Sequence, residues 1–185
     1  MGVEVNERAA EAVIRFFDLL MVWNARINLT GARSVADLVE EHWPDSVALA
    51  RVVPDRARLL EVGAGGGLPA LPFAILRPDV ALTLLEPRSK RVAFLRTALR
   101  QVQTAAAIRP ERLEDTDRGE FDVVSARATF SPTEWWSRGR QVVRAGGTVV
   151  FYLADAADLP ADVKTVARID YEAAGRRRVV VSASV

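Results

Sequence analysis

The sequence predicts an α/β fold built around a mostly parallel sheet of seven strands. From Ala57 onward, short apolar runs typical of buried strands alternate with amphipathic segments typical of helices. One of these runs, residues 57–62, leads into three closely spaced glycines and then a helix. Only five residues, 172–176, separate the last two apolar runs, which is too few for a crossover helix. We therefore expect the last strand to be inserted antiparallel in the sheet.

Ahead of the sheet, residues 1–56 are expected to form a helical extension. Apolar residues at helical spacing indicate a first helix, and they are Val13, Phe16, Phe17, Leu20 and Met21. A second helix is expected to begin at Ser34 and a third near Pro44. We expect one domain, 1–185, in which this extension precedes a Rossmann-like core at 57–185.

Within the core, strands and helices alternate, which is typical of a sheet covered on both faces. The expected strands are 57–62, 80–86, 106–110, 121–126, 147–153, 163–170 and 177–184. The expected helices begin at 69 and span 89–103 and 132–143. Pro69 suits the first position of its helix, because the N–H that proline lacks would be unpaired there.

The composition of the 185 residues is that of an ordinary globular protein, with 50% hydrophobic and 26% charged residues. The absence of cysteine excludes disulfides, thiolate metal ligands and cysteine nucleophiles, and a single histidine argues against a histidine metal site. No apolar run reaches the roughly 18 residues of a membrane span, and the N-terminus lacks the basic start of a secretory signal. We expect a cytoplasmic protein without metal or membrane contacts, and we expect it to be a monomer.

The segment after the first strand has the pattern of a nucleotide-type cofactor site. Gly63, Gly65 and Gly67 allow positive φ and close approach of the backbone to a ligand, because glycine has no Cβ. Glu86 ends the next apolar run, 19 residues after Gly67, where a carboxylate can accept hydrogen bonds from ribose hydroxyls. A dinucleotide site has the spacing G-x-G-x-x-G, but Leu68 stands where its last glycine would be. The spacing G-x-G-x-G favours S-adenosylmethionine over NAD.

Longer stretches of the chain resemble the glucose-inhibited division protein B family. These stretches are 23–30 (WNARINLT), 42–46 (HWPDS), 65–72 (GGGLPALP), 89–96 (SKRVAFLR) and 125–128 (SARA). The resemblance implies a Rossmann-like class I methyltransferase that modifies the N7 atom of a guanine in the decoding-centre loop of small-subunit (16S) ribosomal RNA. It also implies S-adenosylmethionine as cofactor, and ribosomal RNA or the small ribosomal subunit as partner.

One region departs from the family pattern. Tyr152-Leu153-Ala154 stands where the family has a lysine and a glycine, and the following segment, 155–162, is shorter than the helix-containing stretch expected there. Both changes fall where substrate contacts could form. Two alternatives therefore stay open: a methyltransferase of another RNA or of a small molecule, and a ribosome-associated module that binds the cofactor without turnover. No Asp-Pro-Pro-Tyr type motif follows the fourth strand, which argues against methylation of an amino group.

The expected cofactor-binding residues are Glu61, Gly63, Gly65, Gly67, Leu68, Glu86, Leu113, Glu114 and Arg127. We expect Glu86 to bind the ribose, with a solvated acid at a strand end as the alternative. Glu61 is expected either to orient the methionine amino group through water or to be a structural acid. The resemblance implies that adenine binds near Glu114, for which the alternative is a charge on a solvated loop.

Arg127 follows the strand 121–126, at the carboxyl edge where ligands of such sheets bind. Its planar donor group can hold guanine or a phosphate, so we assign it the catalytic role; a salt bridge with a neighbouring acid is the alternative. N7 of guanine loses no proton before it attacks, so no general base is required. We therefore expect His42, with Asp45 and Ser46, to shape the floor of the substrate pocket or to tie the helical extension to the sheet.

Basic residues gather beside the cofactor motif, because residues 86–112 hold seven Lys or Arg against two acids. On the helix 89–103, a buried stripe is expected from Val92, Leu95, Leu99 and Val102. It leaves toward solvent the RNA-binding candidates Arg88, Lys90, Arg91, Arg96 and Arg100. The alternative is an ordinary solvated face. A second candidate patch is Arg176, Arg177 and Arg178, and Trp135 and Trp136 are candidates for base stacking, although one of such a pair usually packs inward.

Overall fold

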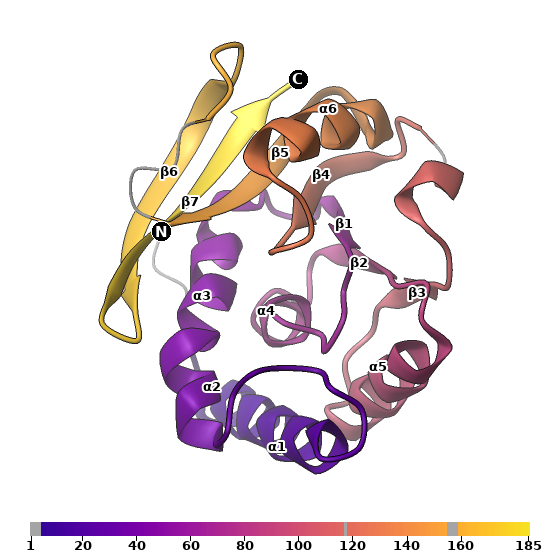
Figure 1. Cartoon of the computed structure of the whole chain (residues 1–185), viewed down its shortest axis with the longest axis vertical. Coiled ribbons are helices and arrows are strands. Elements are labelled where there is room, and N and C mark those ends of the chain that lie inside the picture. Colours follow the sequence, from indigo (N-terminus) through magenta and orange to yellow (C-terminus); the bar gives the residue numbers. More distant parts are fainter. Residues whose placement is uncertain (1–4, 117, 155–158) are drawn as a thin grey trace.

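The computed structural model describes residues 5–116, 118–154 and 159–185. Its centre is a seven-stranded sheet with the order β3-β2-β1-β4-β5-β7-β6 (Figure 1). The strands are β1 (Arg58–Val62), β2 (Ala81–Leu85), β3 (Ala107–Arg109), β4 (Phe121–Ala126), β5 (Val143–Ala154), β6 (Lys164–Ala173) and β7 (Arg176–Ser184). The first five strands pair in parallel, and β7 is antiparallel to both of its neighbours. The predicted sheet with an antiparallel last strand is confirmed.

The middle of the sheet is buried on both faces. Leu59 and Leu60 have no exposed surface, and their side chains point to opposite faces because residues alternate along a strand. Near-continuous apolar runs of this kind are typical of parallel strands covered on both sides. The buried polar residues of β1 and β4 are Glu61 and Ser125, which are in register with each other near the carboxyl ends of their strands. These two residues lie where the candidate site begins.

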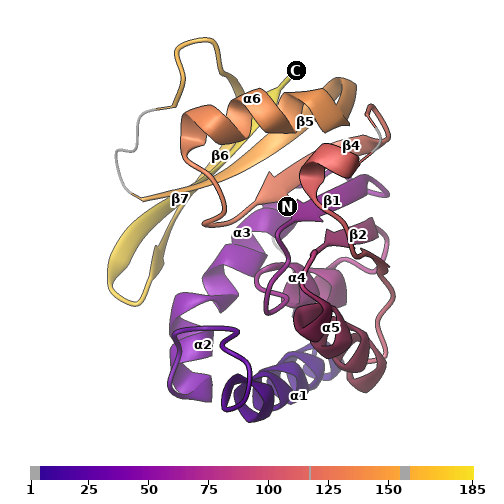
Figure 2. The ribbon, with the colours of Figure 1, turned by 45° about the vertical axis from the view of Figure 1, so that its right-hand side comes forward.

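Helices cover both faces of the sheet, as predicted (Figures 1 and 2). They are α1 (Glu7–Asn24), α2 (Val35–Glu41), α3 (Trp43–Val52), α4 (Ala70–Leu76), α5 (Ser89–Gln101) and α6 (Pro132–Val142), with a 3-10 turn η1 at Leu113–Asp115. One core packs α1 to α5 on the face of Leu59, and the other packs α6 on the face of Leu60. No helix within the described ranges is long and apolar enough to span a membrane.

The helical extension is attached through its apolar face. Helix α1 begins after the N-cap Asn6, whose side chain accepts a hydrogen bond from the Ala9 N–H at 2.9 Å. The predicted stripe is confirmed except for Met21, which is only partly buried; the buried members are Val13, Phe16, Phe17 and Leu20. Helix α2 follows the predicted start at Ser34. Helix α3 contacts α4, β6 and β7, so it connects the extension with the far end of the sheet.

The C-terminal strands are longer than predicted. Strand β5 begins at Val143 instead of residue 147, because Val143 already pairs with Phe121 ahead of a register shift. The turn between β6 and β7 consists of Ala174 and Gly175, both with positive φ (48° and 69°), where a five-residue connection was expected. Two-residue turns with positive φ match the twist of a hairpin, so both strands extend to the turn. Of the short segment 155–162, residues 155–158 lie outside the described residues.

Candidate active site

The glycine turn joins β1 to α4 and has the predicted left-handed backbone. Gly63, Gly65 and Gly67 have φ values of 71°, 54° and 75°. A Cβ at Gly67 would lie 2.8 Å from the side chain of Leu71, so a larger residue here would require Leu71 to shift in addition to a strained backbone. Leu68 precedes Pro69 through a cis peptide, and Pro69 is the N-cap of α4, so the helix begins at Ala70, one residue later than predicted. The turn therefore brings backbone amides to the carboxyl ends of β1 and β2.

Glu86 is the acid that fixes this turn. Only 2% of the residue is exposed, and its Oε2 accepts a hydrogen bond from the Gly65 N–H at 2.9 Å. Oε1 accepts from the Arg88 N–H at 2.9 Å, and the Arg91 guanidinium lies 3.8 Å from Oε2. Each carboxylate oxygen can accept a second hydrogen bond, so ribose hydroxyls can still be bound. The alternative of a solvated acid at a strand end is wrong.

Leu113 and Glu114 line a pocket at the same edge. The pocket also includes Gly63 and Leu85, from the ends of β1 and β2, and Phe130 from the loop before α6. Leu113 is buried, whereas the Glu114 side chain is 59% exposed and forms an ion pair with Arg138. The structure thus brings the two predicted residues beside the glycine turn. Phe130 was not predicted, because no local pattern marks a loop residue that reaches the site only through the fold.

Glu61 is a buried acid behind the turn. It is 1% exposed, and the Ser125 hydroxyl donates a hydrogen bond to its Oε2. Burial raises the pKa of Glu61 to about 7, although the hydrogen bond from Ser125 and the charge of Arg127 oppose this shift. A carboxyl group with this pKa can carry or release a proton near neutral pH.

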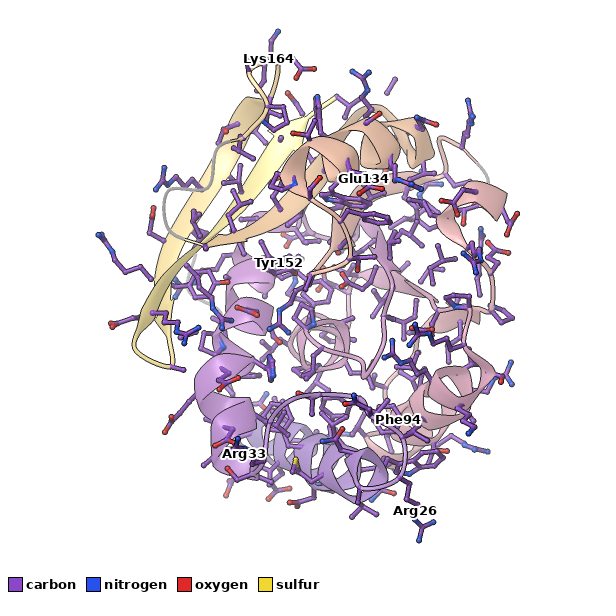
Figure 3. All side chains as sticks on the ribbon, viewed as in Figure 1. Arg26, Arg33, Phe94, Glu134, Tyr152 and Lys164 are labelled. Carbon is purple, nitrogen blue, oxygen red and sulfur yellow. The ribbon has the colours of Figure 1, made fainter. Side chains whose placement is uncertain are left out.

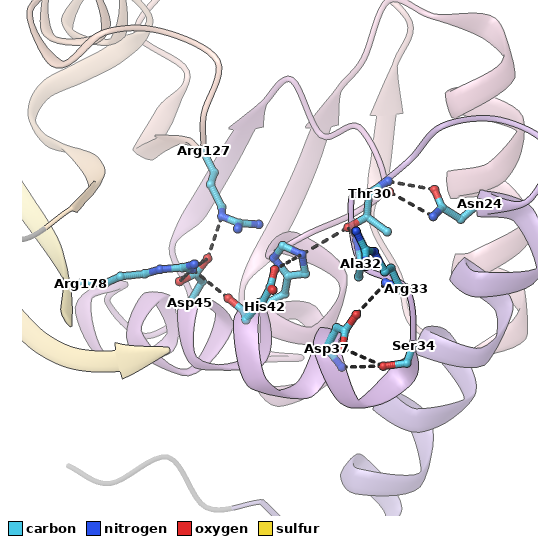
Figure 4. A network of polar contacts seen from close by, with 11 residues as sticks. Asn24, Thr30, Ala32, Arg33, Ser34, Asp37, His42, Asp45, Arg127 and Arg178 are labelled. Carbon is cyan, nitrogen blue, oxygen red and sulfur yellow. Dashed lines mark hydrogen bonds and ion pairs between the residues drawn. The ribbon is translucent and has the colours of Figure 1, made fainter. Parts of the chain in front are cut away.

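A second polar cluster centres on Asp45, which is 1% exposed (Figure 4). Arg127 Nε lies 2.7 Å from Asp45 Oδ2, and Arg178 donates to both carboxylate oxygens at 3.0 and 3.1 Å. The Tyr171 hydroxyl donates to Oδ1 at 2.7 Å. One aspartate of α3 therefore holds residues from the end of β4 and from both strands of the C-terminal hairpin. The salt bridge that was the alternative for Arg127 exists, and it directs the guanidinium toward the carboxyl edge.

His42 and Ser46 connect the start of α3 to neighbouring loops. His42 Nε2 lies 3.2 Å from the Thr30 hydroxyl, and the Ser46 hydroxyl donates to the Pro69 carbonyl oxygen at 3.0 Å. Burial lowers the pKa of His42 to about 4, and the charge of Arg127 acts in the same direction. The imidazole is therefore neutral at neutral pH. These contacts agree with a role in tying the helical extension to the sheet.

The basic helix α5 has the predicted buried stripe, and Val102 is its buried C-cap. Four of the candidate cations are exposed, namely Arg88, Lys90, Arg96 and Arg100. Arg91 does not point to solvent as expected: it lies against Glu86 and donates to the Asn28 carbonyl oxygen at 3.4 Å. A groove beside it is lined by Arg26, Asn28, Arg88, Lys90 and Arg91. Arg26 is a cation that the sequence analysis missed, because it comes from a loop 62 residues before Arg88.

The structure contradicts two further predictions, the basic patch in the last hairpin and base stacking by the paired tryptophans. Arg178 turns inward to Asp45, so Arg176 to Arg178 do not form one solvent-facing patch. Trp135 and Trp136 are both buried, and their indole N–H groups donate to the Val150 carbonyl oxygen and to Asp162, each at 2.8 Å. Neither indole is available for base stacking in this arrangement. Figure 3 shows how densely side chains fill the space between sheet and helices.

The sequence profile of the GidB family, described as rRNA small subunit methyltransferase G, matches residues 9–168. The chain belongs to this family. It is 35% identical over 170 residues to Ribosomal RNA small subunit methyltransferase G of Methylococcus capsulatus, covering 88% of this chain and 82% of that protein. It is 32% identical over 193 residues to the protein of the same name from Neisseria gonorrhoeae, covering 98% and 91%.

Solved structures agree on the fold. A SAM-dependent methyltransferase from Aquifex aeolicus superposes with a TM-score of 0.61 at 11% identity, covering 80% of this chain and 93% of that one. The predicted family, the predicted Rossmann-like α/β fold and the prediction of a methyltransferase are confirmed. Family membership does not assign roles to single residues, so these follow from the geometry of the two clusters.

Proposed function

We propose that this protein transfers a methyl group from S-adenosylmethionine to N7 of a guanine in 16S ribosomal RNA. The observation that carries the proposal is the pairing of two sites at one sheet edge in a member of the rRNA small subunit methyltransferase G family. One site is the glycine turn closed by Glu86, and the other is Arg127 held by Asp45. We propose that the chain acts as one domain, 1–185, in which the extension 1–56 supplies Asp45.

The first site fits the cofactor. Three glycines with positive φ let a ligand approach the backbone of the turn closely, and a buried carboxylate stands beside it, as an adenosine ligand requires. Glu86 would hold the ribose, the pocket of Leu113 and Glu114 the adenine, and Glu61 the methionine ammonium group. When bound, S-adenosylmethionine supplies a methyl carbon whose bonding electron pair stays with the sulfur. Leu68 and the three glycines would shape the turn around it.

The second site fits a base that needs positioning rather than deprotonation. Guanine N7 already presents a lone pair, so the protein must hold the ring in line and exclude competing nucleophiles. Asp45 engages Nε of Arg127, and the guanidinium has two further nitrogens that can donate to the base or to its phosphate. The pKa of His42, lowered to about 4, makes its imidazole a weak base, and its Nε2 is hydrogen-bonded to Thr30; both support a positioning role over that of a general base.

The exposed cations of α5 would bind RNA phosphates. Arg88, Lys90, Arg96 and Arg100 lie on the helix that follows Glu86, so a bound backbone would pass beside the cofactor site. Binding to phosphates needs positive charge without a specific sequence, and this face supplies only one sign of charge. The groove that includes Arg26 would extend this binding surface toward the helical extension.

Radiolabelled cofactor tests the proposal. The protein is incubated with small ribosomal subunits that lack N7-methylguanine, and separately with naked 16S RNA and transfer RNA, and the labelled nucleotide is then mapped. We expect label only at N7 of a guanine in the 16S RNA, and less of it with a Glu86→Ala variant at the same subsaturating cofactor concentration. Label in another RNA would favour the alternative substrate. Cofactor binding without transfer to any RNA would favour a non-catalytic module.

A further inference from the structure

Tyr152 lies in β5 where the chain departs from its family pattern. Its strand neighbour is Val180 on β7, and Val150, two residues earlier on the same face, is in register with Ser125. Tyr152 packs at the border of the core that holds α1 to α5, on the side of the sheet where α3 carries Asp45. Figure 3 labels it close to α3 and the C-terminal hairpin. The side chain therefore reaches the region between Glu61 and Asp45.

The Tyr152 hydroxyl is buried, and no described residue lies in hydrogen-bond geometry with it. A buried hydroxyl without a partner is destabilising, because it has lost its water without gaining a protein acceptor. Phenylalanine would fill the same space without this penalty. An unpaired buried group of this kind calls for a partner that binds from outside the chain.

Tyr152 borders a pocket with the chemistry of a nucleotide site. The pocket is lined by Asp45, Arg127, Tyr152, Tyr171, Arg177 and Arg178, among others, and lies at the carboxyl ends of β4 and β5. Burial is the main cause that raises the pKa of the Tyr152 phenol, and Glu61, Asp45 and Tyr171 act in the same direction, so the phenol keeps its proton. It is a neutral O–H donor among guanidinium groups, which suits an acceptor atom on a purine.

We propose that this pocket receives the target guanine and that the Tyr152 hydroxyl donates a hydrogen bond to guanine O6. The inference rests on the proposed function, and it adds a residue that orients the base. O6 is next to N7 on the same edge of guanine, so a donor to O6 orients the ring and leaves the N7 lone pair free to react. Adenine presents an amino donor at that position, so there the hydroxyl could only accept a hydrogen bond.

Tyr152→Phe tests the inference, with Tyr171→Phe as the matched control. Both variants remove one hydroxyl from the same pocket, but the Tyr171 hydroxyl already donates to Asp45. Single-turnover methylation is measured on 16S RNA with guanine or with 2-aminopurine, which lacks O6, at the mapped target position. The melting temperature without RNA is measured in parallel.

For wild-type protein we expect guanine to react at least about 10-fold faster than 2-aminopurine, since the analogue cannot accept this hydrogen bond. Tyr152→Phe should lower the guanine rate to near the 2-aminopurine rate, keep its cofactor affinity and melt no lower than wild type. Tyr171→Phe should melt at a lower temperature and keep the wild-type ratio of the two rates. A wild-type ratio in Tyr152→Phe, or a lower melting temperature, would overturn the inference. If the wild-type protein methylates no guanine in the RNA, the proposed function itself fails.

Discussion

The two sides of the site differ in how their polar groups are satisfied. At the ends of β1 and β2, the Glu86 carboxylate accepts hydrogen bonds from the Gly65 and Arg88 N–H groups. The polar groups on this side are therefore already paired before any ligand binds. On the other side, the Tyr152 hydroxyl is buried without a partner among the described residues, although Tyr152 lines the pocket beside Arg127. The cofactor side is therefore preorganised, whereas the substrate side holds a polar group that we propose an RNA base satisfies.

The two sides also differ in how ligand binding affects the stability of the folded protein. A turn that is already fixed by a buried acid can receive a small ligand without rearrangement, which favours tight binding of one defined molecule. Unsatisfied polar groups lower the stability of the free protein, and a ligand that supplies partners removes this penalty. Substitutions on the two sides should therefore separate stability, cofactor affinity and RNA binding.

The largest effect is expected from Asp45→Ala. The substitution leaves Arg127, Arg178 and Tyr171 without their shared acceptor, in a place where they are mostly buried. We expect the free energy of unfolding to fall by about 3 kcal/mol or more, because breaking a buried ion pair leaves uncompensated charge. Asp55→Ala is the control: Asp55 also pairs with an arginine, Arg77, at 2.9 Å, but its side chain is 84% exposed, so its loss should cost less than about 1 kcal/mol. Equal losses in urea unfolding of the two variants would contradict a buried network.

The pH dependence of stability should show opposite contributions from the two sides. Glu61 has a pKa raised from 4.5 to about 7, so the stability that it contributes to the folded protein is fully present below pH 4.5 and is lost as pH rises to 7. His42 has a pKa lowered from 6.5 to about 4, so its contribution grows as pH rises from 4 to 6.5. The two effects nearly offset each other, and wild-type stability should be almost flat between these limits.

Single variants should expose each effect. Glu61→Gln should gain stability as pH rises between pH 4.5 and 6.5, and His42→Asn should lose it, each by up to about 3 kcal/mol. The hydrogen bond from Arg77 holds the pKa of Asp79 below its usual range, so that group titrates below this window. Urea unfolding at several pH values is the measurement. Parallel pH profiles for the two variants would contradict the opposite pKa shifts of Glu61 and His42.

On the cofactor side, Glu86→Ala should weaken binding of S-adenosylmethionine about 10-fold to 150-fold. This range corresponds to a loss of roughly 1.5 to 3 kcal/mol, the usual value of hydrogen bonds to a charged group. Calorimetric titration measures it. Glu120→Ala serves as control, because Glu120 pairs with Arg109 at 2.9 Å outside the turn and should leave affinity unchanged. Wild-type affinity of a folded Glu86 variant would remove this residue from the site.

The smallest effect concerns RNA electrostatics. Changing Arg96 and Arg100 to Glu should reduce the slope of log affinity against log salt by roughly 0.7 to 0.9 for each RNA phosphate that the variant no longer neutralises. Arg51→Glu is the control, because Arg51 is also exposed but lies near the end of α3 and not on α5. Equal slopes for the double variant and wild type would make α5 an ordinary solvated face.

The sequence predicted the cofactor side well because its determinants are local. The spacing of the glycines and Glu86, and the periodicity of Val92, Leu95 and Leu99, follow from the geometry of one turn and one helix. Both were found in the structure where they were expected. The exception is Arg91, whose direction depends on Asn28 in a distant loop.

The substrate side could be predicted only in part, because its contacts join residues far apart in the chain. Asp45 was placed at the site by resemblance, but its bonds to Tyr171 and Arg178 depend on how the C-terminal hairpin packs on α3. Nothing in the local pattern of β6 distinguishes Tyr171 from an ordinary strand residue. The same packing turned Arg178 inward, against expectation.

The division of labour between the two sides is tested most directly by single-turnover methyl transfer to 16S RNA at saturating cofactor and RNA, with Glu86→Ala and Arg127→Ala compared with wild type. If Glu86 serves cofactor binding and Arg127 serves positioning of the base, saturation should restore the Glu86 variant to near the wild-type rate. The Arg127 variant should stay about 10-fold or more slower, although its cofactor affinity is close to wild type. A slow Glu86 variant beside an Arg127 variant of wild-type rate would contradict this assignment.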